Sequence, residues 1–232
     1  MKSHELIAQT RTEKRAALDE QAGKALLAEY GVAVPRSLTV KHAGEVDAAF
    51  AKLRGPLVVK IMSPDILHKS DAGGVKVGLK SAAEVKAAIN AMAASPAIKS
   101  ARVDGYLIEE MAPAGQEMVI GGLRDPDFGP LVMVGLGGIF VEVLQDVSFR
   151  ICPITQLDAE EMINELKGAA ILDGARGRQP ASRPAIVDAL LKVGGENGLL
   201  MNHAQDIKEA DINPLIVSAS AAVAVDARFI LS

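Results

Sequence analysis

Several kinds of residue are scarce in this chain of 232 residues, and each shortage narrows what the protein can do. Only 3% of the residues are aromatic and none is tryptophan, so a surface that stacks on nucleic-acid bases is not expected. The formal net charge of -4 gives no basic footprint for nucleic acid either. The most apolar stretch, residues 129–141, is too short and too rich in glycine to span a bilayer.

Cysteine is nearly absent as well. Cys152 is the only one, so no disulfide can form within the chain, which is typical of a reducing compartment. The N-terminal residues contain no apolar stretch of the secretory type. We therefore expect a cytoplasmic protein. Because Ile151 and Pro153 flank the cysteine, we interpret its thiol as a buried structural group rather than a nucleophile.

Turn residues and hydrophobic spacing predict an α+β fold with antiparallel sheets rather than repeating βαβ units. Thr12 is expected to cap a helix that ends at Gly31, and Ser81 with Glu84 to cap another. Residues 207–217 and 222–229 are expected to form a terminal hairpin. A loop between Pro96 and Gly105 suggests two lobes, residues 1–104 and 105–232.

A stretch near the middle of the first lobe carries the parts of a phosphate-handling site. Lys60 lies in an apolar strand, where it can be a cation for phosphates or an edge lysine with its amine in solvent. His68 follows in the next loop, and neutral imidazole can accept a phosphoryl group, although a lone histidine is more often structural. Gly73 and Gly74 can form a phosphate-binding loop or a tight turn.

The C-terminal hairpin gives the sharpest local pattern. Glu209, Asp211 and Asn213 alternate along one strand, so they share a face. If the hairpin closes symmetrically about residues 218–221, Asn213 lies opposite Asp226. Carboxylate and amide oxygens are ligands suited to Mg²⁺ with nucleotide phosphates, so we favour a metal site over a solvated polar face. Elsewhere Glu109 and Glu117 flank a Pro/Gly turn. Their carboxylates can be surface charges, or they can accept hydrogen bonds from the amine and ribose of a nucleoside.

Taken together, several segments resemble a known family. They are KIMSPDILHKSDAGGVKVGL, YLIEEM, GGLRDPDFGPLVMVGLGGIFVEVLQDVSFRICPIT, ADINPL and AVDARF. They are similar to the ATP-grasp subunit or domain of ADP-forming acyl-CoA synthetases, such as acetate:CoA ligase, and more distantly to the nucleotide-binding subunit of succinyl-CoA synthetase. The resemblance covers nearly the whole chain and implies two lobes that enclose a nucleotide cleft.

The resemblance also implies a role for individual residues. Lys60 matches a family residue that contacts the α- and β-phosphates of ATP, and Glu117 matches one that binds the ribose. His68 matches a histidine that relays a phosphoryl group, and Asp211 an acidic residue that orients it. Asn213 and Asp226 match Mg²⁺ ligands. The adenine contacts, made largely through backbone, would come from Ile108, Glu109 and Met111.

The implied reaction is acyl-CoA + ADP + phosphate ⇌ carboxylic acid + CoA + ATP, with a phosphohistidine between two sites. The chain has no glycine-rich βαβ unit for CoA, so a CoA-binding partner chain or domain in a hetero-oligomer is expected. Two alternatives stay open. One is a non-catalytic ATP-binding regulatory module of a CoA- or acyltransferase-linked protein. The other is an ATP-dependent carboxylate–amine ligase, which would need no His68.

Overall fold

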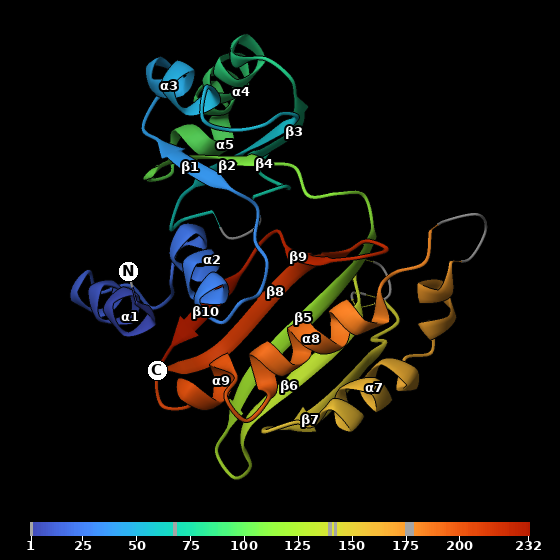
Figure 1. Cartoon of the computed structure of the whole chain (residues 1–232). Coiled ribbons are helices and arrows are strands. Elements are labelled where there is room, and N and C mark those ends of the chain that lie inside the picture. Colours follow the sequence, from blue (N-terminus) through green and yellow to red (C-terminus); the bar gives the residue numbers. More distant parts are fainter. Residues whose placement is uncertain (1, 67–68, 139–140, 142, 175–178) are drawn as a thin grey trace. The chain divides into compact units, whose positions relative to one another are not determined.

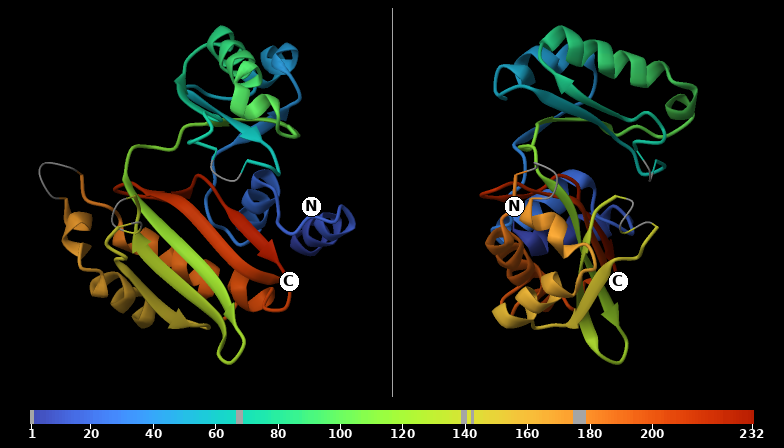
Figure 2. Two further views of the ribbon diagram at one scale, coloured as in Figure 1. Left: turned by 180° about the vertical axis from the view of Figure 1, so that it is seen from behind. Right: turned by 90° about the vertical axis from the view of Figure 1, so that its right-hand side faces the viewer.

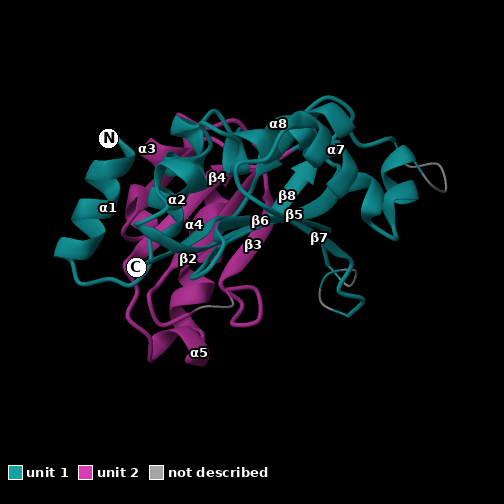
Figure 3. Cartoon of the chain, turned by 90° about the horizontal axis from the view of Figure 1, so that it is seen from below, with its two compact units in different colours: residues 1–34, 113–232 teal, residues 35–112 magenta. Residues whose placement is uncertain are grey.

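The computed structural model describes residues 2–66, 69–138, 141, 143–174 and 179–232. Backbone contacts divide the chain into two compact units, which Figure 3 shows in different colours. Unit 1 comprises residues 1–34 and 113–232, and unit 2 comprises residues 35–112. Within the described ranges, no helix combines the length and the apolar character that a membrane crossing requires.

Unit 2 is a four-stranded antiparallel sheet with helices on one face (Figure 1). Its strands, in the spatial order β1-β4-β2-β3, are β1 (Ser37–Val40), β4 (Gly105–Glu110), β2 (Leu57–Met62) and β3 (Val75–Leu79). Its helices are η1 (Ala43–Glu45), α3 (Val46–Phe50), α4 (Ala82–Ala94) and α5 (Pro96–Lys99). The core of the unit lies between them and includes Val59, Ile61, Ile89 and Ile108.

The cap expected for α4 is confirmed. The side-chain oxygen of Ser81 accepts a hydrogen bond from the backbone N–H of Glu84, 3.2 Å away. Glu84 in turn accepts from the N–H of Lys80, one residue before the cap. The first turn of the helix thereby gains partners for backbone groups that have none inside the helix.

Unit 1 is built on a larger antiparallel sheet in the order β10-β8-β5-β6-β7, with β9 paired to β8. Its strands are β5 (Gln116–Asp125), β6 (Gly129–Leu136), β7 (Val147–Ile151), β8 (Ile207–Val217), β9 (Ala222–Ala224) and β10 (Arg228–Leu231). Its helices are α1 (Ser3–Thr12), α2 (Glu20–Glu29), α7 (Gln156–Glu165), η2 (Ala169–Asp173), α8 (Arg183–Gly194) and α9 (Leu199–Asn202).

The two faces of this larger sheet differ. Helices α7, α8 and α9 lie across one face in Figure 1, and the main core of the unit, with Ile120, Val134, Leu190 and Ile212, fills the space between. The view from behind in Figure 2 shows no helix across the opposite face of β5, β6 and β8. We call this second side the open face. It is the side on which β8 presents its polar residues.

The N-terminal segment differs from the sequence prediction. The helix expected to start at Thr12 begins instead at Glu20, and Thr12 is the last residue of the preceding helix α1. The residue that caps α2 is Asp19, whose carboxylate accepts from the N–H of Ala22 at 2.8 Å. The backbone between the helices is held by β10, because the N–H of Leu18 donates to the carbonyl of Phe229. Leu18 falls on the helical spacing of Ala22 and Leu26, so the spacing alone did not reveal that the helix starts after it.

The division of the chain also differs from the expected boundary at residues 104 and 105. Strand β4 pairs with β1 and β2, which places residues 105–110 in the first sheet. The N-terminal helices α1 and α2 belong to unit 1, with the C-terminal sheet. Both assignments depend on pairing between distant segments, which local sequence patterns do not encode.

Candidate functional site

The terminal hairpin has the register that the sequence predicts. The turn closes with a hydrogen bond from the N–H of Ser218 to the carbonyl of Ala221, 2.8 Å away. Beyond β9, the N–H of Asn213 donates to the carbonyl of Asp226 at 3.2 Å. Asn213 and Asp226 therefore lie directly opposite one another, although residues 225–227 interrupt the strand that was expected over 222–229.

The polar residues of β8 share the open face. Ile212 is fully buried on the helix side, whereas Asp211 and Asn213 are exposed. Strand β10 places Arg228 opposite Asp211. The sequence interpretation did not single out Arg228. The signal available for it was its position, because the same symmetric register that pairs Asn213 with Asp226 pairs Asp211 with Arg228.

The charges around Asp211 act on it in opposite directions. Desolvation by the surrounding protein raises the pKa of the Asp211 carboxyl, and the nearby Asp226 carboxylate raises it further. The Arg228 guanidinium lowers the same pKa. The group is thus coupled to both neighbours, which is the arrangement expected where ionisable side chains are gathered for binding or catalysis rather than spread over a solvated face.

Asn213 and Asp226 fit a magnesium ion by their chemistry. They offer one amide oxygen and one carboxylate, and Mg²⁺ usually takes one or two carboxylates, with water and substrate phosphates completing its shell. Among the side chains that the structure describes, no group of three or more His, Cys, Asp or Glu residues gathers as a metal cluster.

A hollow of about 340 Å³ lies on the open face, and Asp211 and Arg228 are among the residues that line it. One row of side chains crosses it in strand register: Arg228, Asp211, Gly121, Met133 and Phe149. Gly121 keeps the middle of the row low, since a Cβ there would lie 2.8 Å from the terminal carbon of Met133. The hollow therefore has a charged end at Arg228 and Asp211 and an apolar end at Met133 and Phe149, with no side chain rising from Gly121 between them.

In unit 2, the environment of Lys60 excludes one of the two alternatives considered from the sequence. It lies on the interior strand β2 and is only 5% exposed, so it is not an edge lysine with its amine in solvent. Its Nζ forms an ion pair with Oε1 of Glu109, 2.6 Å away, and Glu109 is fully buried. Both side chains lie on the sheet face opposite the helix-packed core, as strand alternation requires.

The glycine pair after the His68 loop forms a tight turn. The N–H of Gly73 donates to the carbonyl of Ser70, and the N–H of Gly74 donates to that of Lys69. Gly73 has a positive φ of 71°, and a Cβ on Gly74 would lie 2.4 Å from Ile61. These features support the turn interpretation, because both N–H groups already have partners within the loop.

Some of the residues expected to contact a nucleoside belong to unit 2, and one belongs to unit 1. Ile108, Glu109 and Met111 lie in or next to β4 of unit 2, and the N–H of Met111 donates to the carbonyl of Pro56. Glu117 lies on β5 of unit 1 with an exposed side chain, while its carbonyl accepts from the N–H of Gly137. His68, the expected phosphoryl acceptor, lies outside the described residues.

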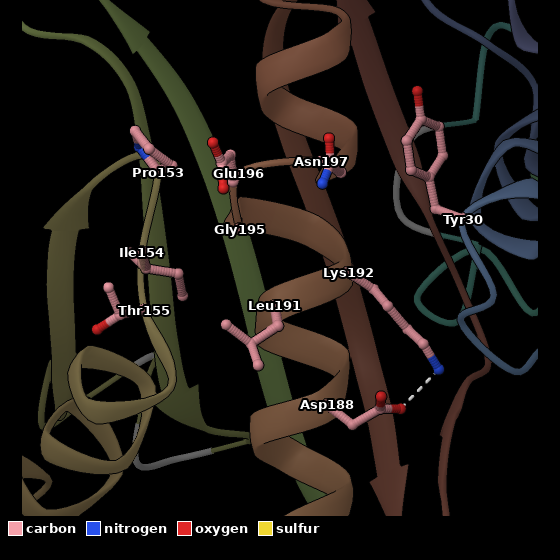
Figure 4. Close-up of a pocket in the computed structure, with 10 residues that line it drawn as sticks. All are labelled: Tyr30, Pro153, Ile154, Thr155, Asp188, Leu191, Lys192, Gly195, Glu196 and Asn197. Carbon is pink, nitrogen blue, oxygen red and sulfur yellow. Dashed lines mark hydrogen bonds and ion pairs between the residues drawn. The ribbon is translucent and has the colours of Figure 1, made fainter.

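The larger cavity of unit 1 is not at these residues. Figure 4 shows a cavity of about 530 Å³ on the helix side, where Lys192 of α8 pairs with Asp188 at 2.6 Å and Tyr30 lines the rim. None of the residues predicted from the sequence lines it. Cys152, on the same side of the sheet, is buried, and desolvation raises the pKa of its thiol to about 12. Both facts agree with a structural cysteine.

Comparison with protein families and curated proteins identifies relatives along the whole chain. Residues 9–231 match the model of an ATP-grasp domain. Acetate–CoA ligase [ADP-forming] I subunit beta of Pyrococcus furiosus is 43% identical over 232 residues, which cover 99% of this chain and 98% of that subunit. The 4-hydroxybutyrate–CoA ligase [ADP-forming] of Nitrosopumilus maritimus is 40% identical, but the matching part is only 31% of that longer chain.

Solved structures agree with this assignment. The dinucleotide forming acetyl-coenzyme A synthetase 1 of Ca. Korarchaeum cryptofilum, in complex with coenzyme A and Ca-AMPCP, superposes with a TM-score of 0.92 at 40% identity, covering 99% of this chain and 100% of that one. Another structure of that synthetase contains Mg-AMPPCP, with a phosphohistidine segment that points towards the nucleotide binding site. The present chain belongs to the ATP-grasp family, among the nucleotide-binding β subunits and domains of ADP-forming acyl-CoA synthetases.

Proposed function

We propose that this chain is the nucleotide-binding half of an ADP-forming acid–CoA ligase, which moves a phosphoryl group between ATP or ADP and His68. The observation that carries the proposal is the terminal hairpin, where Asn213 lies opposite Asp226 and next to Asp211 on an uncovered sheet face. Relatives of this activity match nearly the full length of the chain.

The roles of the residues follow from their chemistry. Lys60 would bind the α- and β-phosphates, and Asn213 with Asp226 would hold Mg²⁺, which when bound neutralises phosphate charge. The backbone around Ile108, Glu109 and Met111 would face the adenine, and Glu117 the ribose. Asp211 would orient the imidazole of His68. Phosphoryl transfer depends mostly on positioning and charge neutralisation, which this set supplies.

In the direction of ATP cleavage, the neutral imidazole nitrogen of His68 attacks the γ-phosphorus. The nitrogen–phosphorus bond forms as the bond to the β-phosphate oxygen breaks, and ADP leaves. The partner, a CoA-binding subunit or domain in a cytoplasmic hetero-oligomer, would carry the acyl phosphate and the acyl-CoA. A relay is needed because the acyl chemistry and the nucleotide chemistry then belong to different chains or domains.

The test is to map phosphohistidine directly. The chain, assembled with its CoA-binding partner, is incubated with Mg²⁺ and ATP labelled at the γ-phosphate, and acid-labile, base-stable phosphate is located by peptide mapping. The four histidines, His4, His42, His68 and His203, fall in separate segments, so the site can be assigned.

We expect label on His68, its loss in His68→Ala, and its retention in His4→Ala, the matched control at an exposed position of α1. Label that persists in His68→Ala would refute the relay. Tight ATP binding without any label would favour a regulatory module, and a fully active His68→Ala enzyme would favour a carboxylate–amine ligase.

A further inference from the structure

Arg228 is an exposed arginine whose environment contrasts with that of other arginines in unit 1. Its guanidinium makes no hydrogen bond or ion pair with any residue in the described part of the chain. Arg11 pairs with Asp206 at 2.9 Å, and Arg183 pairs with Asp173 at 3.0 Å. Arg150 pairs with Glu165 and Arg124 donates to backbone carbonyls.

The lack of an ion pair is unexpected from the position of Arg228. Asp211 lies directly across from it on β8, and both side chains are exposed on the open face. An exposed pair of opposite charges in this relation often closes into a salt bridge. Instead, the guanidinium and the carboxylate both line the 340 Å³ hollow. Each group therefore keeps donor or acceptor capacity for something that enters the hollow.

The chemistry around Arg228 selects an anion with several oxygens. Two carboxylates and an amide oxygen, from Asp211, Asp226 and Asn213, lie beside it and suit a metal ion and an imidazole rather than an anion. Among the described residues that line the hollow, the guanidinium of Arg228 is the one positively charged side chain. Its planar fork of N–H donors matches the oxygens of a phosphoryl group.

We propose that Arg228 binds the non-bridging oxygens of the phosphoryl group as it passes between the nucleotide and His68. This inference rests on the proposed function and adds a residue to it. While the nitrogen–phosphorus bond forms and the bond to the β-phosphate oxygen breaks, Arg228 donates N–H hydrogen bonds and transfers no proton. Donors aimed at charge that is greatest in the transition state accelerate the step more than they tighten binding.

The kinetic test compares single-turnover labelling of His68 in wild-type, Arg228→Ala and Arg228→Lys complexes. We expect Arg228→Ala to slow transfer about 100- to 1,000-fold, the usual effect of removing one such donor, with little change in ATP affinity. Arg228→Lys should lie between, because lysine keeps the charge without the fork. Guanidinium ion added to Arg228→Ala should restore part of the rate.

The matched control is Lys208→Ala. Lys208 is a 60% exposed cation on the same β8 strand, where it pairs with Glu209 at 3.8 Å and is not among the described residues that line the hollow, so its loss should leave the rate unchanged. Equal rates in Arg228→Ala and wild type would overturn the inference and leave the proposed function standing. A wild-type complex that never labels His68 would instead refute the proposed function.

A second test uses the unmodified protein and measures no turnover. Phenylglyoxal reacts with accessible arginines, and peptide mass spectrometry follows each one separately. We expect Arg228 to react readily, and Mg²⁺ with ATP to slow its modification at least about tenfold, whereas Mg²⁺ with AMP, which lacks the γ-phosphate, does not. Arg124 donates hydrogen bonds to backbone carbonyls away from the site, so its rate of modification should not change with either nucleotide. Equal modification of Arg228 with and without ATP would contradict the assignment.

Discussion

Lys60 in unit 2 and Asp211 in unit 1 both lie on antiparallel strands among apolar neighbours, yet their surroundings are opposite. The Lys60 amine is buried and held at 2.6 Å by the buried Glu109 carboxylate. Asp211 is exposed on the open face of its sheet, across from an arginine that forms no ion pair with any described residue. One charge is fixed in place by a counter-ion, and the other stays available to a ligand.

The difference suggests a division of labour. A buried lysine paired with a carboxylate is positioned before substrate arrives, which suits a fixed phosphate contact. Exposed groups on an open face can bind a metal ion and a moving phosphoryl group, then release them. The predictions below test whether the buried pair and the open face behave as differently as this contrast requires.

The largest effect is expected at the buried pair. Lys60→Met leaves the Glu109 carboxylate buried without its counter-ion, so the free energy of unfolding should fall by about 3–5 kcal/mol. The double variant Lys60→Met, Glu109→Leu should recover most of the loss. Urea unfolding followed by circular dichroism measures both.

The control for that prediction lies in the same unit. Lys86 and Asp47 form an ion pair of 2.7 Å whose side chains are 37% and 68% exposed. Lys86→Met should therefore change the free energy of unfolding by less than about 1 kcal/mol. Equal losses in Lys60→Met and Lys86→Met would erase the proposed contrast between buried and exposed charges.

A smaller loss is expected at the turn beside the His68 loop. Gly74→Ala brings a Cβ to within 2.4 Å of Ile61, so it should destabilise the fold by about 1–3 kcal/mol. Gly73 has a positive φ but nothing within 4 Å, so Gly73→Asn should be tolerated better, because asparagine adopts this conformation readily. Thermal unfolding of the two variants tests this expectation. A lower melting temperature for Gly73→Asn than for Gly74→Ala would show that space for a Cβ is not the constraint.

At the metal site the effect should be on binding rather than folding. Asp226→Ala removes the carboxylate ligand, so the Mg²⁺ concentration that half-saturates ATP binding should rise at least about tenfold, a change worth 1.4 kcal/mol. Calorimetric titration of ATP at fixed Mg²⁺ concentrations measures it. Glu209→Gln, on the same face of β8, is the control and should bind like the wild type. An unchanged Mg²⁺ requirement in Asp226→Ala would remove this residue from the site.

The smallest effect is expected at Cys152, whose burial raises the pKa of the thiol to about 12. The protonated form is thus favoured in the native state, and at pH 9 only roughly one thiol in a thousand is thiolate. Iodoacetamide should leave the native protein unmodified at pH 9 and alkylate it fully in urea. Rapid native alkylation would identify a reactive cysteine instead.

The terminal hairpin shows how much of the site the sequence could predict. Alternation along β8 and a short turn were enough to place Asn213 opposite Asp226, because the register of a tight hairpin follows from its turn. The same register implied Arg228 beside Asp211, but an arginine near a chain terminus carries no pattern of its own. The interest of Arg228 comes from its position on the open face. That face is recognised only once the structure shows that α7, α8 and α9 pack on the other side of the sheet.

Lys60 shows the limit of local inference. Its strand position was correct, but whether that strand is interior or at an edge depends on pairing with β4, a segment 45 residues later in the chain. The Glu109 partner follows from the same long-range register. The late start of α2 has a similar origin, since a backbone hydrogen bond from Leu18 to Phe229 holds the segment before it.

The most direct test of the account is a crystal structure of the chain with Mg²⁺ and a non-hydrolysable ATP analogue. The account predicts that the Lys60 amine contacts the α- and β-phosphates while Asn213 and Asp226 coordinate the metal on the same nucleotide. A nucleotide bound by one of these groups with the other facing away from it would contradict the account.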